Sequence, residues 1–284
     1  MSTLVLNTKT VYATGDLHGR FNTIAWYIKQ CDIKNCVIFF LGDFGLGFHS
    51  SEYYKNTFRK ISKELEKRNI YVLALRGNHD NPDYYNSDLF KNGRILTLRD
   101  YTVVKIYGED DIEYKGDSLT ALVVGGGLSI DRCDRIARMK QREITYARFH
   151  QNVSKEDLLK KIPCEYWENE MPVFDVEALE KIDKKGIKID TVLTHSAPDF
   201  CQPILKDGIK YWLKNDKQLS IDSDIERQTL NKVYDWLIEH NHPVQQWCYG
   251  HYHFHNTEVI DGITFKLLDM AGEMSIDIIP IKYF

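Results

Sequence analysis

Short apolar runs, each ending in glycine or a polar residue, recur along the chain. Residues 36–41 (Cys-Val-Ile-Phe-Phe-Leu) are continuously apolar, as a strand buried on both faces of a sheet requires. Similar runs occupy residues 10–15, 70–75, 189–194 and 244–249. In residues 24–31 and 51–65, apolar side chains instead recur every three or four positions, which indicates amphipathic helices. Alternating strands and helices predict an α/β fold with parallel strand pairing.

Polar residues and glycines mark the expected ends of several elements. Asn22 is expected to cap the first helix, and Ser51 to open the second. Asp175 is expected to cap a later helix that stops at Gly186. The pair Asp261-Gly262, between two apolar runs, predicts a two-residue hairpin turn.

The second half of the chain is less regular. Residues 95–106 and 118–124 have the character of strands in a second sheet. A late helix is predicted from the spacing of Ile225, Leu230, Val233 and Leu237. The segments 131–175 and 201–222 are candidates for insertions or a lid, and the first is expected to contain short helices. Because no linker-like stretch divides the chain, we expect a single domain over residues 1–284.

Composition excludes some classes of partner. The net charge of −4 gives no general attraction to nucleic acid or anionic membranes, so nucleic acid is expected only as a substrate. No apolar run approaches the roughly 18 residues of a spanning helix, and the amino terminus lacks a secretion signal. We therefore expect no membrane partner and a cytoplasmic protein. The six scattered cysteines contain no Cys-x-x-Cys pair, which favours reduced thiols.

Five short polar motifs follow the apolar runs. They are residues 15–19 (Gly-Asp-Leu-His-Gly), 41–45 (Leu-Gly-Asp-Phe-Gly), 77–80 (Gly-Asn-His-Asp), 194–198 (Thr-His-Ser-Ala-Pro) and 250–253 (Gly-His-Tyr-His). Ligands of open α/β sheets bind beyond the carboxyl ends of the strands, so these side chains are expected to gather there. One Asp-x-His pair alone more often serves a turn. Five such motifs in one chain indicate a metal site.

The ordered set of motifs resembles the calcineurin-like metallophosphoesterase family, from residue 16 to residue 253. The resemblance implies a four-layer αββα sandwich, in which two mixed β-sheets pack face to face with helices outside. It also implies that a phosphate ester is hydrolysed by a hydroxide bridging two divalent metal ions. Such ions neutralise phosphoryl oxygens and lower the pKa of water.

The same resemblance assigns metal ligands residue by residue. The first ion is matched by Asp16, His18, Asp43 and His253, and the second by Asp43, Asn78, His195 and His251. Asp43 is therefore expected to bridge the two ions. Mixed imidazole and carboxylate ligands suit transition metals better than calcium. We expect manganese first, with iron, zinc, nickel or cobalt as alternatives.

Three further residues match catalytic positions. His79 corresponds to the family's catalytic histidine, which implies a general acid for the leaving oxygen, and Asp80 is placed to orient its ring. Arg76 stands where related phosphoprotein phosphatases carry a phosphate-binding arginine. Phe44-Gly45, after Asp43, departs from the Asp-Arg-Gly motif of those phosphatases.

Two other features add to the resemblance. Residues 126–132 and 166–170 resemble a bacterial and phage branch of the family. Four arginines at helical spacing form one stripe: Arg132, Arg135, Arg138 and Arg142. The stripe is either a solvated face or a source of one or two side chains that reach the substrate's phosphate.

The sequence thus predicts a dinuclear phosphoesterase whose partner is a phosphate ester. Phosphomonoesters are slightly favoured, because Arg76 could hold an extra terminal oxygen. The alternative within enzymes is a phosphodiesterase acting on cyclic nucleotides or nucleic acid ends. A more distant alternative is a binding module that has lost the chemistry, but every expected ligand position is filled.

Overall fold

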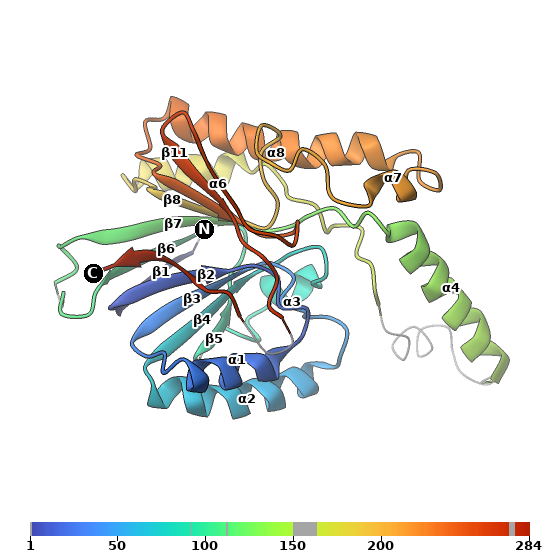
Figure 1. Cartoon of the computed structure of the whole chain (residues 1–284), viewed down its shortest axis with the longest axis horizontal. Helices are drawn as coiled ribbons and strands as arrows, with labels where there is room; N and C mark the ends of the chain where they lie inside the picture. Colours follow the sequence, from blue (N-terminus) through green and yellow to red (C-terminus); the bar gives the residue numbers. More distant parts are fainter. Residues whose placement is uncertain (1, 92, 112, 150–163, 273–275) are drawn as a thin grey trace.

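Two mixed β-sheets form the centre of the protein (Figure 1). The computed structural model describes residues 2–91, 93–111, 113–149, 164–272 and 276–284. One sheet has the strand order β12-β2-β3-β4-β5, with bounds Ile279–Tyr283, Thr10–Thr14, Cys36–Leu41, Ile70–Leu75 and Ile95–Thr97. The other has the order β1-β6-β7-β8-β9-β11-β10, with bounds Thr3–Thr8, Thr102–Gly108, Ser118–Val124, Thr191–Thr194, Gln246–Tyr249, Ile263–Leu267 and Asn256–Ile260.

Helices cover the outer faces of both sheets. The described helices are α1 (Phe21–Gln30), α2 (Ser51–Lys67), α3 (Pro82–Asn86), α4 (Arg132–Phe149), α6 (Val176–Lys184), α7 (Ile209–Trp212) and α8 (Leu219–Glu239). In Figure 1, α1 and α2 lie against the five-stranded sheet, and α6 and α8 against the seven-stranded sheet. The order helix, sheet, sheet, helix confirms the predicted four-layer αββα sandwich.

The alternation of side chains along β3 shows why the layers form. Val37 and Phe39 point into an apolar core between the two sheets, where they meet residues of β6 and β7 such as Val104 and Ala121. Phe40, on the opposite face, joins a second core under α1 and α2. Both faces of the strand are therefore buried, which explains its continuous apolar sequence.

Most of the predicted elements are present, with local differences. Asp175 caps α6 by accepting a hydrogen bond from the Ala178 N–H, as predicted. Asp261 and Gly262 have positive φ values of 50° and 80° and close the β10–β11 hairpin. Asn22 does not cap α1, because the helix begins one residue earlier, at Phe21.

Residues 95–106 form two strands that belong to different sheets. Ile95–Thr97 pairs with β4 in the five-stranded sheet, whereas Thr102–Gly108 pairs with β1 and β7 in the other. The chain turns between them at Tyr101, which has a φ of 59°. The expectation that the whole segment lies in the second sheet was therefore wrong for its first part.

The segment expected to hold short helices begins with a long one. Helix α4 has 18 residues and extends away from the sheets in Figure 1. Residues 150–163 of that segment lie outside the described residues.

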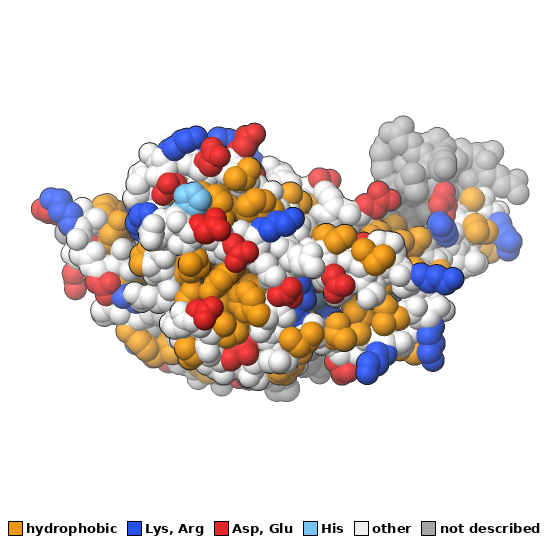
Figure 2. Space-filling view, turned by 90° about the horizontal axis from the view of Figure 1, so that it is seen from above, with side chains coloured by type: hydrophobic (Ala, Val, Ile, Leu, Met, Phe, Trp, Pro, Cys, Tyr) orange, Lys and Arg blue, Asp and Glu red, His pale blue; other side chains and the backbone are white. Residues whose placement is uncertain are grey.

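The outer face of α8 carries exposed apolar side chains, which Figure 2 shows from above. Leu230, Val233 and Leu237 are buried against the seven-stranded sheet, as their spacing predicts. Ile225 is instead 47% exposed, on the outer side of the helix. Among the described residues, no helix combines the length and the apolar character needed to cross a membrane.

Candidate metal centre

The predicted ligands lie where strands of both sheets end. Asp16 and His18 follow β2, Asp43 follows β3 and Asn78 follows β4, three neighbouring parallel strands. Across the interface between the sheets, β8 leads to His195, and β9 to the pair His251 and His253. Each sheet therefore contributes one side of a single cluster.

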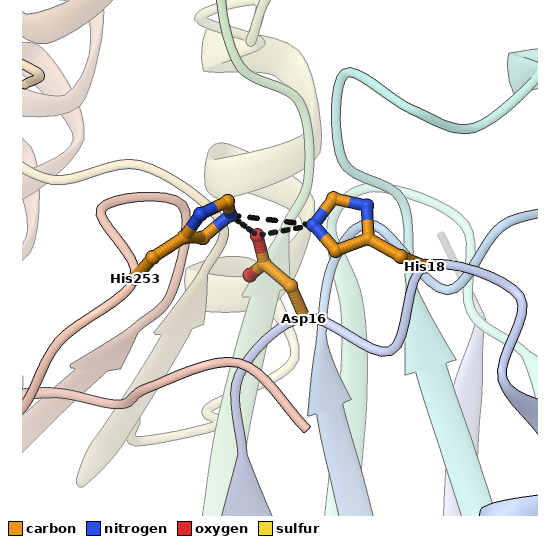
Figure 3. A group of neighbouring side chains, drawn as sticks. All are labelled: Asp16, His18 and His253. Carbon is orange, nitrogen blue, oxygen red and sulfur yellow. Dashed lines mark hydrogen bonds and ion pairs between the residues drawn. The ribbon is translucent and has the colours of Figure 1, made fainter. Parts of the chain in front are cut away.

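Asp16, His18 and His253 point toward one another (Figure 3). The Asp16 Oδ2 atom is 2.8 Å from His253 Nε2 and 3.6 Å from His18 Nε2. The two imidazole Nε2 atoms are 3.3 Å apart. Burial lowers the pKa of His18, although Asp43 and Asp16 act in the opposite direction. A neutral imidazole beside a carboxylate is the form that binds a metal ion.

The other four predicted ligands form an adjoining group. His195 Nε2 lies 3.3 Å from Asp43 Oδ1, 3.0 Å from Asn78 Oδ1 and 3.1 Å from His251 Nδ1. Burial holds the pKa of His251 well below its usual range. Nitrogen and oxygen atoms with free electron pairs thus face one another at short distances, an arrangement that a cation stabilises.

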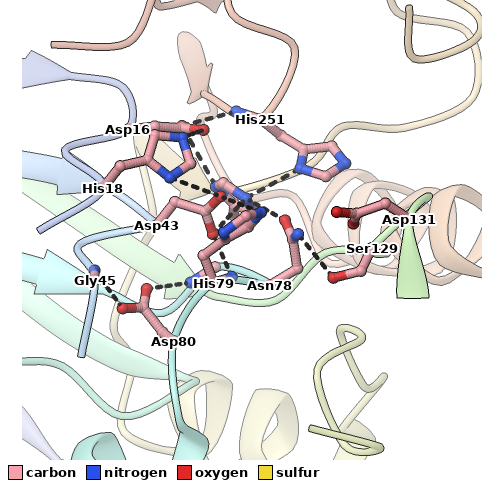
Figure 4. A network of polar contacts seen from close by, with 12 residues as sticks. Asp16, His18, Asp43, Gly45, Asn78, His79, Asp80, Ser129, Asp131 and His251 are labelled. Carbon is pink, nitrogen blue, oxygen red and sulfur yellow. Dashed lines mark hydrogen bonds and ion pairs between the residues drawn. The ribbon is translucent and has the colours of Figure 1, made fainter. Parts of the chain in front are cut away.

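Asp43 lies between the two groups (Figure 4). Its Oδ1 faces His195, while its Oδ2 is 3.9 Å from His18 Nδ1. The Oδ2 atom is buried and has no hydrogen-bond partner among the described residues. Burial alone would raise the pKa of Asp43, but His79, His195 and His18 around it lower that pKa well below its usual range. A buried, ionised and unpartnered carboxylate oxygen fits a metal ligand.

Four of the predicted ligands have a backbone conformation that non-glycine residues rarely adopt. The φ values of His18, Asp43, His251 and His253 are 51°, 45°, 72° and 60°. Such conformations cost about 1–3 kcal/mol each and persist where the surrounding structure enforces them, often at functional sites. Other non-glycine residues with positive φ, such as Asn69 and Asp261, lie outside the cluster, but these four meet in it.

A chain of hydrogen bonds orients the Asn78 amide. Its Nδ2 donates to Ser129 Oγ at 3.0 Å, and that hydroxyl donates to Glu170 Oε2 at 2.7 Å. Since the nitrogen is held by Ser129, the Asn78 oxygen must face His195. Ser129 and Glu170 lie in segments 126–132 and 166–170, and the sequence predicted no role for either residue.

Asp80 has a different role from the predicted one. Its carboxylate accepts hydrogen bonds from the N–H groups of Phe44, Gly45, Leu46 and Gly77, at 2.7–3.0 Å. It therefore ties the loop after β3 to the loop after β4, and it does not contact the His79 ring. Burial raises the pKa of Asp80 to about 6, Asp43 adds to this effect, and the backbone donors oppose it.

Arg76 is also placed differently from the prediction. Its side chain is buried and donates to Asp100 and to the carbonyl groups of Glu170 and Met171. With these donors occupied, the guanidinium supports the loop that carries Glu170 and is not free to hold a phosphate. The structural reason is the position of Arg76 before Gly77, from which its side chain turns away from the ligand cluster.

One arginine of the predicted stripe reaches the cluster instead. Arg135 is buried, and its Nη2 lies 2.5 Å from His79 Nε2. Arg132 pairs with Asp216 and Asp222, and both Arg138 and Arg142 pair with Glu165. All four arginines therefore pair with nearby acids, Arg135 with Asp131, and Arg135 in addition contacts His79. Contact of the stripe with a substrate's phosphate stays a prediction.

Lys206 is a further cation at the cluster, and it comes from a segment with no motif. Its Nζ is 3.2 Å from His251 Nδ1. Glu226, on α8, lies on another side of the same ring, 3.9 Å from His251 Nε2, and accepts a hydrogen bond from the Leu128 N–H. Burial lowers the pKa of Lys206, while Asp43, Asp16 and Glu226 raise it.

Three solved structures match most of this chain at low sequence identity. A phosphopantetheinyl hydrolase from Mycobacterium tuberculosis is 14% identical, with a TM-score of 0.42, over 93% of this chain and 90% of that one. A Thermus thermophilus protein is 10% identical, with a TM-score of 0.47, over 97% of this chain and 100% of that one. A dimetal phosphatase from Danio rerio is 12% identical, with a TM-score of 0.45, over 95% of this chain and 92% of that one. A search of curated proteins gave no match.

The family comparison covers most of the chain. The family described as calcineurin-like phosphoesterase matches residues 9–255, a range that contains every predicted ligand. Asp and His side chains within that range form the clusters that can hold a metal ion. The chain therefore belongs to the calcineurin-like phosphoesterase family.

Proposed function

We propose that this protein hydrolyses phosphate esters with two divalent metal ions held between Asp16, His18, Asp43 and His253 on one side and Asp43, Asn78, His195 and His251 on the other. When bound, the ions would neutralise phosphoryl oxygens and acidify a water molecule. Imidazole and carboxylate ligands favour transition metals over calcium without choosing among them, and manganese is the ion that we test first.

The observation that supports two ions most directly is the position of Asp43. Its two carboxylate oxygens face different groups of predicted ligands, Oδ1 toward His195 and Oδ2 toward His18. The Oδ2 atom is buried without a hydrogen-bond partner in the described part of the chain. A carboxylate that presents one oxygen to each side is the ligand that can bridge two ions.

The remaining residues prepare the site for a phosphoryl group. The Ser129–Glu170 pair orients the Asn78 oxygen toward the space proposed for the ions. Asp80 ties the loop that carries Asp43 to the loop that carries Asn78. His79, beside Asp43, is proposed to face the leaving oxygen. Because Arg76 is occupied elsewhere, it no longer supports a preference for monoesters.

The proposal is tested with Asp43→Asn, which keeps the size of the side chain but removes its charge. We expect metal content, measured by mass spectrometry after gel filtration in manganese, to fall at both positions, and hydrolysis of p-nitrophenyl esters to be lost. Asp88→Asn is the matched control, since that carboxylate is exposed. Two ions retained in folded Asp43→Asn would contradict the bridge.

A further inference from the structure

Two cationic side chains reach the ligand cluster from separate elements. Arg135 comes from α4 and contacts His79, and Lys206 comes from the loop between β8 and α7 and contacts His251. The carboxylates of Asp43 and Asp16 attract the Lys206 ammonium, and Arg135 repels it. The rings that they contact flank one carboxylate: His79 Nε2 is 3.9 Å from Asp43 Oδ2, and His251 adjoins His195, which is 3.3 Å from Asp43 Oδ1.

The position of Lys206 is fixed by a buried arginine. Arg227, on α8, donates to four backbone carbonyl groups of the preceding loop, at 2.5–2.6 Å. The four acceptors are Pro198, Cys201, Pro203 and Ile204. Since the last of them is only two residues before Lys206, the guanidinium sets where the lysine side chain begins. An ordinary surface loop needs no such anchor.

Arg135 is anchored in a comparable way. Its Nε donates to Asp131 Oδ1 at 2.7 Å, and its Nη1 donates to the Glu165 carbonyl at 3.2 Å. The start of α4 is also fixed, because Arg132 pairs with Asp216 and Asp222. These contacts leave Nη2 directed at His79.

Lys206 forms no ion pair with the described residues. In the described ranges of the chain, no carboxylate oxygen lies within 4.0 Å of its Nζ, although the side chain is half-buried. An ammonium that lies beside the ligand cluster without a carboxylate partner is suited to bind an anionic ligand.

We propose that Lys206 and Arg135 form an anion clamp over the metal centre that selects phosphomonoesters, a proposal that rests on the function proposed above. A monoester carries up to two negative charges near neutral pH, because its second pKa is about 6. A diester carries one, and its second organic group replaces the oxygen that the clamp would hold. Arg135 Nη2, the guanidinium nitrogen directed at the cluster, and the lysine ammonium supply donors for the terminal oxygens.

The test compares p-nitrophenyl phosphate with bis-p-nitrophenyl phosphate in wild type, Lys206→Met and Arg135→Met. We expect each variant to lower kcat/KM for the monoester by about 10- to 100-fold, the usual effect of losing one hydrogen bond to a charged group. The diester should change by less than about 3-fold, because it lacks the extra charge. Arg135→Lys should lose less than Arg135→Met.

Matched controls come from neighbouring positions. Lys210→Met removes a charge from α7, and Arg138→Met removes one from α4, both at exposed side chains. Both should leave the ratio of the two ester activities unchanged. Equal losses of monoester and diester activity in Lys206→Met would overturn the clamp, as would loss of metal from that variant.

A binding measurement separates this proposal from the proposed function. Calorimetric titration of inorganic phosphate into manganese-loaded protein should show affinity reduced about 10- to 100-fold in Lys206→Met. Unchanged phosphate affinity would refute the clamp whether or not either ester is hydrolysed. A wild-type protein that binds manganese and hydrolyses neither ester would instead refute the phosphoesterase function.

Discussion

The imidazole of His79 lies between a cation and an anion. Its Nε2 is 2.5 Å from Arg135 Nη2 and 3.9 Å from Asp43 Oδ2. An arginine nitrogen only donates, so Nε2 accepts this bond and carries no proton in this geometry. Burial lowers the pKa of His79 to about 3, with Asp43 opposing the effect and Arg135 adding to it. A role as general acid therefore requires the substrate to displace Arg135 from the ring.

Leaving-group dependence tests that role. If His79 protonates the leaving oxygen, His79→Ala should slow hydrolysis of alkyl phosphates by roughly 10²–10⁴-fold and spare p-nitrophenyl phosphate, whose leaving group needs no proton. Metal content should not change. Equal slowing of both esters would show instead that His79 acts by holding Arg135 in place.

Glu170 gives a pH-dependent contribution to stability. Burial raises its pKa to about 8, against the hydrogen bonds from Ser129 and the charge of Arg135. The folded protein therefore keeps a proton that the unfolded chain releases near pH 4.5. The contribution of Glu170 to the free energy of unfolding is therefore fully present below about pH 4.5. It decreases as the pH rises toward 8, by at most about 1.4 kcal/mol per pH unit.

Glu170→Gln should remove this dependence, because glutamine is neutral at every pH. Urea unfolding at several pH values between 5 and 8 should show the variant gaining stability relative to wild type as the pH rises. Glu168→Gln, at an exposed position two residues earlier, should track the wild type. A constant difference between Glu170→Gln and wild type would mean that Glu170 is ionised in the folded protein.

At the scale of elements, close packing of loops decides where the ligands lie. A Cβ atom on Gly77 would be 2.1 Å from Asp43 Oδ1 and 2.8 Å from His195 Nε2. No larger residue fits there without moving the proposed bridging carboxylate. On Gly108, a Cβ atom would meet nothing closer than Phe284, at an ordinary 3.4 Å.

We therefore expect Gly77→Ala to lose metal affinity and activity, with at least a tenfold rise in the manganese dissociation constant, comparable to the loss of a residue that orients a ligand. Gly108→Ala should bind metal like wild type. Calorimetric titration of both variants with Mn²⁺ makes the comparison. Unaltered affinity in Gly77→Ala would mean that the Asp43 carboxylate can shift without consequence.

The elements, and the gathering of the predicted ligands at the strand ends, were predictable from the sequence because both follow from local pattern. Apolar runs such as residues 36–41 mark buried strands, and the motifs after them are brought together by parallel pairing. The roles of Arg76 and Asp80 were not predictable, since the direction of a side chain depends on the partners around it. The role of Lys206 was not predictable either, because no motif surrounds it and its contact with His251 is made by folding.

For the whole molecule, the proposed metal ions would connect the two sheets. Asp16, Asp43 and Asn78 follow strands of the five-stranded sheet, whereas His195 and His253 follow strands of the other. Ions bound to both sides stabilise only the folded arrangement. Occupancy at 100 times the dissociation constant adds about 2.7 kcal/mol for each independent site.

Metal removal should therefore lower the melting temperature. We expect Tm measured in excess chelator to be several degrees below Tm in saturating Mn²⁺. Asp43→Asn should show little of this difference, which separates specific binding from a general effect of salt. Identical Tm values for wild type in chelator and in Mn²⁺ would contradict a metal link between the sheets.

The spread of the ligands along the chain has a consequence for biosynthesis. Asp16, Asp43 and Asn78 leave the ribosome well before His195 and His253, which stand much later in the chain. The five-stranded sheet also needs β12, its last strand, to complete the edge beside β2. Until translation reaches residue 195, a nascent chain therefore holds three of the four ligands proposed for the first ion and two of the four proposed for the second. The proposed centre can be complete only after residue 253 has left the ribosome.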